Sequence, residues 1–194
     1  AVQFSDGLFV APHTNCTIDL GSLVEQLAVP SQPHVLNMAH SYETAGATYP
    51  YGCHIAEVEI DPASCDITIV KFTVVDDFGL VINPMMLAGQ IHGGIAQGVG
   101  QALYEHVVYD DSGQILSGSF MDYTMPRADH FPQLDIHMHN TPCQNNILGI
   151  KGSGEAGAIG APQAVVSAVC DALGIQHVDM PVTPLKIFSI LHQN

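Results

Sequence analysis

The feature that most constrains this 194-residue chain is a glycine-rich stretch that leads directly into an apolar helix. Residues 148–160 hold five glycines around a single carboxylate, Glu155. Because glycine tolerates positive φ and close backbone approach, such a loop can lie tightly against a group that is not protein. Glu155 is therefore either a solvated loop acid or a base directed into a site, and residue type alone favours the solvated interpretation.

The helix after this loop has recognisable ends. Pro162 suits a first helical position and Gly174 suits the residue that stops a helix, so we predict a helix over residues 162–173. Its apolar face consists of Val165, Val166, Val169 and Leu173.

A second helix is predicted from Pro84 to about His106, opened by Asn83. When successive residues are placed about 100° apart around the helix axis, the apolar residues fall on one arc. The opposite side carries a stripe of three glutamines, Gln90, Gln97 and Gln101. Glycine is unfavourable inside a helix by ~1 kcal/mol, so the interior glycines need a compensating reason: Gly93, Gly94, Gly98 and Gly100. Tight packing of two helices supplies one reason. Close approach of a group that binds the glutamine amides supplies another, and both stay open.

Alternating and β-branched residues predict several strands. A hairpin is expected from 54–60 and 67–75 with an acidic outer face, and a further strand from 134–139. Residues 1–29 predict a short hairpin followed by a helix capped by Asp19 or Ser22. The fold class is therefore α+β, with mixed short strands and hairpins packed with two principal helices. A short helix with buried Ile187, Phe188, Ile190 and Leu191 is expected near the C-terminus.

Composition excludes several classes of function. Apolar residues make up 47% of the chain and charged residues 12%, which is typical of a globular core. The net charge of −15 argues against nucleic-acid binding, which needs clustered Lys and Arg, and against an anionic membrane surface. The apolar runs are too short to predict a membrane span. Five scattered cysteines indicate reduced thiols and a cytoplasmic protein. His137 and His139 have no third ligand at metal spacing, so no metal site is predicted.

Residues 152–157 read G-x-G-x-x-G, the pattern of a dinucleotide-binding loop. Their context does not fit that fold, because the preceding strand is short and no acidic residue follows at the ribose position. Glu155 would also repel a phosphate inside the loop. A phosphate-binding P-loop is excluded as well, because Lys151 precedes the glycines.

Two stretches together resemble the molybdenum-binding large subunit of the xanthine dehydrogenase, aldehyde oxidase and aerobic carbon monoxide dehydrogenase family. They are residues 82–105 and 148–157, with supporting similarity over 51–59, 122–127 and 179–184. The similar blocks follow the family's order and spacing over nearly the whole chain.

The resemblance implies that Glu155 is the catalytic base. It also implies a molybdenum–molybdopterin cofactor, bound by Gln90, Gln97, Gly152, Ser153 and Gly154. The implied reaction is hydroxylation of an aldehyde, an N-heterocycle or carbon monoxide with oxygen derived from water. No residue of this chain is expected to ligate the metal.

The family's large subunit is several times longer, so we expect residues 1–194 to be the C-terminal part of a molybdenum cofactor-binding domain, inactive alone. The expected partners are the rest of the molybdenum subunit, iron–sulfur and FAD subunits or domains, a small-molecule substrate and further copies in a homo-oligomer. The alternative is a non-catalytic interaction or subunit-assembly module that retains the fold, in which the glycines only pack helices.

Overall fold

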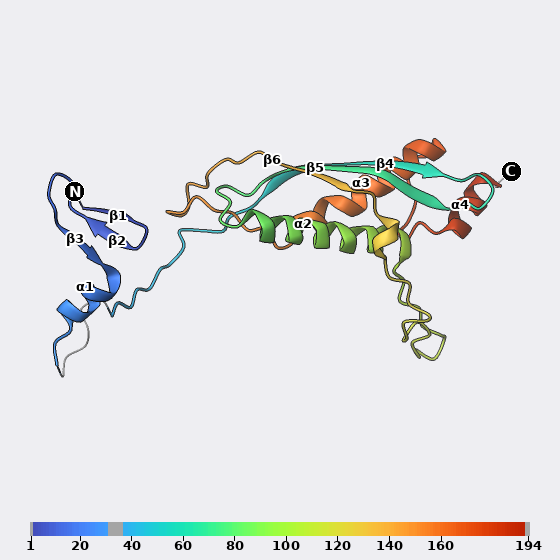
Figure 1. Ribbon diagram of the computed structural model, residues 1–194. Coiled ribbons are helices and arrows are strands. Elements are labelled where there is room, and N and C mark those ends of the chain that lie inside the picture. The colour runs from blue at the N-terminus through green and yellow to red at the C-terminus, as the bar shows by residue number, and fades with distance from the viewer. Residues whose placement is uncertain (1, 31–36, 193–194) are drawn as a thin grey trace. The chain divides into compact units, whose positions relative to one another are not determined.

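The computed structural model describes residues 2–30 and 37–192, which belong to two compact units (Figure 1). The first unit spans Ala1–Glu43 and the second Thr44–Asn194. The first unit holds a three-stranded antiparallel sheet and a helix: β1 (Gln3–Ser5), β2 (Leu8–Val10), β3 (Thr17–Asp19) and α1 (Leu20–Leu27). The predicted hairpin and helix are therefore present, with β3 as an additional strand.

Asp19, and not Ser22, caps α1. The Asp19 carboxylate accepts a hydrogen bond from the backbone N–H of Ser22 at 2.9 Å, which satisfies one of the free donors at the helix start. The rings of Phe4 and Phe9 are tilted against each other with their centroids 4.5 Å apart, yet Phe4 is 57% exposed. No residue among 2–30 and 37–43 is fully buried, so the described part of this unit has no closed core of its own.

The second unit is built on a sheet of three strands: β4 (Tyr51–Ile60), β5 (Ile67–Asp77) and β6 (Leu134–Met138). β4 and β5 form the predicted antiparallel hairpin, and Glu57 and Glu59 are exposed on its outer face as expected. β6 pairs with β5 in parallel, with Phe72 opposite Leu134. The sequence predicted this strand but not its direction.

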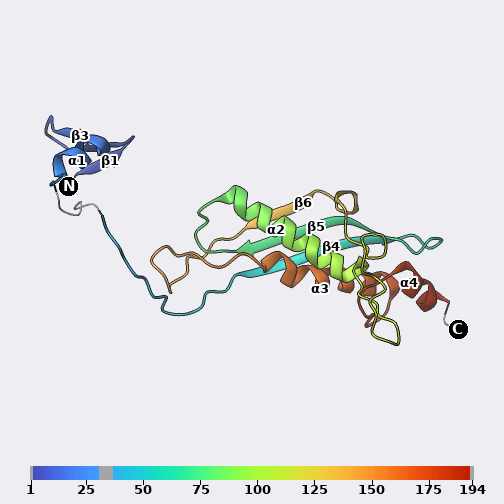
Figure 2. The same cartoon turned by 90° about the horizontal axis from the view of Figure 1, so that it is seen from below.

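Five described helical segments accompany this sheet: α2 (Pro84–Val99), a π-helical turn (Gly100–Tyr104), a 3₁₀ turn (Ala128–His130), α3 (Ala156–Leu173) and α4 (Pro184–Leu191). Figures 1 and 2 show α2 and α3 side by side along the sheet. Both layers contribute fully buried side chains, among them Phe72, Val74, Ile91, Ile95, Val99, Val165, Val169 and Ile187. The α+β class is confirmed. In α4 only Ile187 is fully buried, and the expectation that Phe188 and Leu191 are buried is wrong because both are about half exposed.

Glycines allow α2 and α3 to approach each other closely. A Cβ atom at Gly94 would lie 2.8 Å from the Cα of Gly157, and one at Gly98 would lie 2.8 Å from the Cβ of Ala161. Such contacts are too short for any side chain, so packing of helix against helix explains these glycines. Gly93 differs, because no described atom lies within 4 Å of its Cβ position.

The boundaries of α3 correct one prediction. The helix begins at Ala156, directly after Glu155, and Pro162 lies inside it instead of at its first position. Glycines 157 and 160 suggested a loop because glycine is a weak helix former, but here close packing against neighbours holds them in the helix. Gly174 ends the helix at φ 66° as predicted.

α3 has the length and apolar composition of a membrane-spanning helix. In this fold it packs against α2 and β4, with Val165 and Val169 fully buried. One face of α3 therefore belongs to the core, while 28% of this apolar stretch in all is buried.

Candidate functional site

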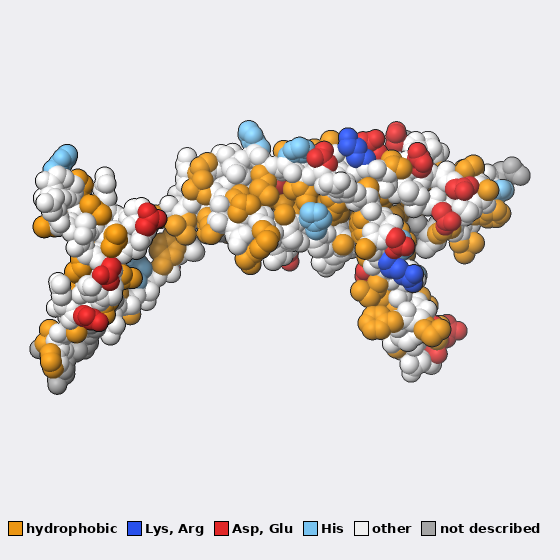
Figure 3. Space-filling model, viewed as in Figure 1, with side chains coloured by type: hydrophobic (Ala, Val, Ile, Leu, Met, Phe, Trp, Pro, Cys, Tyr) orange, Lys and Arg blue, Asp and Glu red, His pale blue; other side chains and the backbone are white. Residues whose placement is uncertain are grey.

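The glycine loop and the start of α2 meet around a pocket of about 320 Å³. Gln90 of α2 and Ser153 of the loop both line it, although they lie far apart in sequence. Leu80, Ile82 and Met86 contribute an apolar wall, and Figure 3 shows apolar side chains gathered over the N-terminal half of α2. The structure thus brings two of the predicted cofactor-binding residues to one hollow.

The loop is held in place by backbone hydrogen bonds to the segment that follows β5. The N–H of Leu80 donates to the carbonyl of Gly149, and the N–H of Lys151 donates to the carbonyl of Phe78, each at 2.9 Å. Gly79 and Gly149 have φ of 68° and 65°, and a side chain on Gly79 would collide with the Gly149 carbonyl. Glycine is required at this crossing, which fixes where the loop leaves the sheet.

A partly buried ion pair anchors the same loop. The Lys151 Nζ lies 2.7 Å from Oδ2 of Asp77, and these side chains are 7% and 12% exposed. Burial acts to raise the pKa of Asp77, but hydrogen bonds from Lys151 and from the backbone N–H groups of Thr141 and Gly79 outweigh it and hold this pKa well below its usual value. The Lys151 ammonium is thereby committed to Asp77 instead of being free for an anionic ligand.

We expect Lys151→Met to lower the free energy of unfolding at neutral pH by about 2 kcal/mol, because Asp77 keeps its charge but loses its partner. Because the pKa of Asp77 is lower in the folded state than in the unfolded state, its charge stabilises the fold at pH values above its unfolded pKa, near 4. This contribution is lost as the pH falls below that value. The variant should therefore lose less stability than the wild type between pH 5 and pH 2, as measured by urea unfolding. Lys71→Met is the matched control, because the Lys71–Glu57 pair is more than half exposed. Equal effects from both lysines would contradict this account.

The other predicted site residues do not line this pocket. Glu155 is the residue before α3; it is exposed, and its side chain makes no capping hydrogen bond to the described helix. Gly152 and Gly154 have no described atom within 4 Å of their Cβ positions, so the outer side of the loop is open. Gln97 is exposed two turns further along α2 and does not line this pocket.

A buried pair that was not predicted from the sequence, His54 and Asp76, lies beneath the start of α3. The alternation of the strand could have indicated His54. Ile55, Glu57 and Glu59 point outward, so the residue at position 54 points inward. Within residues 2–30 and 37–192, no group of three or more His, Cys, Asp or Glu side chains is arranged to hold a metal ion.

Comparison with known proteins identifies the family. Residues 1–132 match the model of the molybdopterin cofactor-binding domain. The nicotine 6-hydroxylase large subunit of Paenarthrobacter nicotinovorans is 38% identical over 78% of this chain and 19% of its own length. The carbon monoxide dehydrogenase large chain of Hydrogenophaga pseudoflava is 33% identical over 82% of this chain and 20% of its own. The crystal structure of quinoline 2-oxidoreductase from Pseudomonas putida 86 superposes with a TM-score of 0.86 at 33% identity, over all of this chain and 26% of that one. The chain thus spans about a fifth of the length of the curated relatives.

Proposed function

Because this chain belongs to the molybdopterin cofactor-binding domains of the molybdenum hydroxylase family, whose cofactor is molybdenum–molybdopterin, we propose that it supplies the general base and one wall of the cofactor site. Glu155 is the proposed base. The observation that carries the proposal is that Gln90 and Ser153 line the same pocket. Ser153 lies only two residues before Glu155 in the chain.

The residues around this pocket suit the pterin part of the cofactor. The Gln90 amide offers two donors and one acceptor, and the backbone of residues 152–154 is unobstructed on its outer side. A flat polar ring system can lie against such a surface and be held by neutral hydrogen bonds. Lys151 is paired with Asp77, so this wall does not provide a free positive charge for the cofactor's anionic part. We assign that part to another segment of the complete subunit.

Glu155 is suited to take up a proton. Its carboxylate is exposed and is not used to cap the described helix α3, so it is available as an acceptor. When bound, the cofactor supplies an oxidising centre that accepts an electron pair from the substrate. Glu155 accepts the proton of the water-derived hydroxyl that is transferred, as a general base.

The substrate that we propose is a small molecule: an aldehyde, an N-heterocycle or carbon monoxide. The names of the relatives support this range, since they include a nicotine hydroxylase, a quinoline oxidoreductase and a carbon monoxide dehydrogenase. The proposed partners are the rest of the molybdenum subunit and iron–sulfur and FAD subunits that carry electrons away, in a homo-oligomeric assembly.

A non-catalytic module remains the second candidate, because helix packing alone explains Gly94 and Gly98. Packing does not explain Gly93, Gly152 or Gly154, which face open space in the described structure. Glycines on an open face are what a closely approaching ligand requires, so this observation favours the cofactor site.

The test is Gln90→Ala in the assembled enzyme. We expect a loss of cofactor affinity of about 1–3 kcal/mol, because a buried polar group of the cofactor loses its partner. Molybdenum retained after gel filtration measures this loss. Gln101→Ala is the control, since Gln101 is exposed on the same stripe but outside the proposed set. In the isolated chain, Gln90→Ala should leave the melting temperature unchanged. Unfolding of that variant would show that Gln90 is a packing residue instead.

A further inference from the structure

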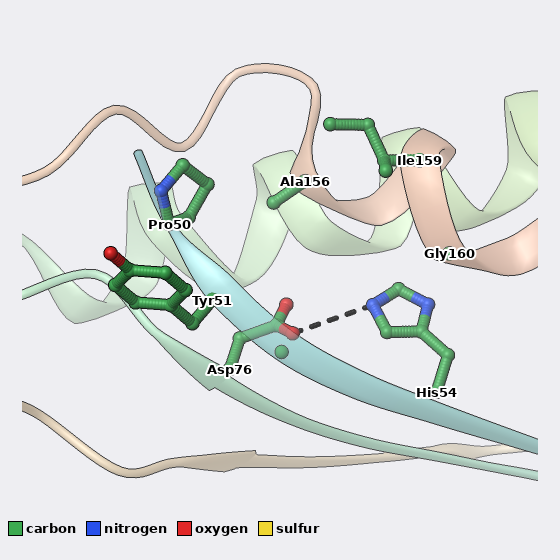
Figure 4. Close-up of a pocket in the computed structure, with 8 residues that line it drawn as sticks. Pro50, Tyr51, His54, Asp76, Ala156, Ile159 and Gly160 are labelled. Carbon is green, nitrogen blue, oxygen red and sulfur yellow. Dashed lines mark ion pairs between the residues drawn. The ribbon is translucent and has the colours of Figure 1, made fainter. Parts of the chain in front are cut away.

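A histidine and an aspartate are buried where the sheet of the second unit meets α3. The side chains of His54 in β4 and Asp76 in β5 are 5% and 2% exposed, and Nε2 of His54 lies 3.4 Å from Oδ1 of Asp76 (Figure 4). The His54 ring stands edge-on to Phe72, and a Cβ atom at Gly160 of α3 would lie only 2.7 Å from it. The pair is therefore clamped between the sheet and the first turns of α3.

Each member of this pair has a second polar atom that is not satisfied. His54 Nδ1 and Asp76 Oδ2 are buried and make no hydrogen bond to any described residue. Buried polar groups in native proteins are nearly always bonded to protein or to ordered water. When the Nε2 proton of a neutral His54 faces Asp76, Nδ1 is an acceptor. The site then presents two acceptors, so its ligand must donate hydrogen bonds.

Both side chains line a pocket of about 120 Å³ that also reaches the first turn of α3. Gly52 of β4 and Ala156 and Ile159 of α3 form other parts of its wall. A single water needs roughly 10–15 Å³ of such space and two to four polar partners. The pocket therefore has room for ordered water. An anion would be repelled by Asp76, and two side chains are too few to hold a metal ion.

The start of α3 needs the acceptors that such water provides. The first N–H groups of a helix have no intrahelical partner. The Glu155 carbonyl accepts hydrogen bonds from the N–H groups of Ala158 and Ile159. The Glu155 side chain accepts no hydrogen bond from the N–H groups at the start of the described helix. The negative charge of Asp76 near this positive helix end is also favourable.

We propose that this pocket is a site for ordered water, which donates to His54 and Asp76 and accepts from the first-turn N–H groups of α3. The water caps α3 from the side of the sheet and fixes the residue before the helix, Glu155. His54 and Asp76 are then positioning residues for the base. This last step rests on the proposed function, whereas the water site itself does not.

Nuclear magnetic resonance on the labelled 194-residue chain tests the water site. We expect cross-relaxation between long-lived water and the amides of Ala156 and Gly157, and an unprotonated Nδ1 on His54. Asp76→Ala should abolish the water signal and speed hydrogen exchange of these amides about fivefold, the effect of losing a helix cap. The control is Asp135→Ala, because the Asp135–His137 pair has similar chemistry at 2.9 Å but is about half exposed.

Absence of long-lived water at these amides in the wild type would overturn the proposed water site. This outcome does not depend on whether the Asp76→Ala variant folds. Equal exchange rates in the folded Asp76→Ala variant and the wild type would overturn the capping role. In the assembled enzyme, Asp76→Ala should lower kcat at unchanged KM and molybdenum content, unlike Asp135→Ala. An unchanged kcat of the Asp76→Ala enzyme would overturn the positioning role of His54 and Asp76. The proposed function is tested separately by Glu155→Gln, which removes the carboxylate of the base itself.

Discussion

Glu155→Gln in the assembled enzyme should leave the molybdenum content unchanged and lower kcat by about 10²–10⁴-fold, the usual contribution of a general base. Glutamine matches glutamate in size but cannot accept the proton. The side chain of Glu155 makes no capping bond in the described structure, so the substitution should not disturb α3. Steady-state turnover and metal content, measured on the same sample, separate lost chemistry from lost cofactor.

The control for this experiment is Glu59→Gln. Glu59 is an exposed carboxylate on the outer face of β4, and its replacement should leave kcat unchanged. Near-normal turnover of Glu155→Gln at normal molybdenum content would contradict the assignment of the base. A loss of molybdenum would instead show that Glu155 helps to hold the cofactor site together.

Two neighbouring glycines of α2 should respond to alanine with opposite signs. Gly94→Ala should destabilise the chain by about 1–3 kcal/mol, since its methyl group would meet the backbone of Gly157 and helix α3 must move away. Gly93→Ala should stabilise it by up to about 1 kcal/mol, because alanine favours the helix and this position is open. Urea unfolding of both variants measures the difference.

The paired design makes the result specific to the contact between α2 and α3. Both substitutions add one methyl group in one turn of the same helix, so helix propensity changes equally and cancels in the comparison. Equal stabilisation by both would mean that α2 and α3 are further apart than described. Equal destabilisation would mean that Gly93 also faces protein.

The strands and helices of the second unit were predictable where one physical pattern dominates. Alternation gave the β4–β5 hairpin, and the apolar arc of α2 includes Ile91 and Ile95, which are fully buried. The start of α3 was misplaced because its glycines are poor helix formers. Only tertiary contacts explain them, since Gly157 packs against α2 and Gly160 against His54 of β4. The parallel pairing of β6 with β5 depends on contacts distant in sequence, so local patterns could not predict it.

For the site, the glycine loop and the glutamine stripe were visible in the sequence, but their meeting was not. Gln90 and Ser153 share a pocket because the crossing at Gly79 and Gly149 directs the loop across the start of α2. The local sequence also left the two explanations of the α2 glycines open. The structure shows that helix packing explains Gly94, whereas Gly93 is open in the described structure, so the approach of a cofactor there stays a prediction.

The most direct test of the central claim is a crystal structure of the assembled, molybdenum-loaded enzyme that resolves the pterin. We expect the pterin against the Gln90 amide and the backbone of residues 152–154, with the Glu155 carboxylate facing the reacting centre. A pterin bound elsewhere, with the Gln90 amide and residues 152–154 in contact only with protein, would contradict the claim that this chain forms part of the cofactor site.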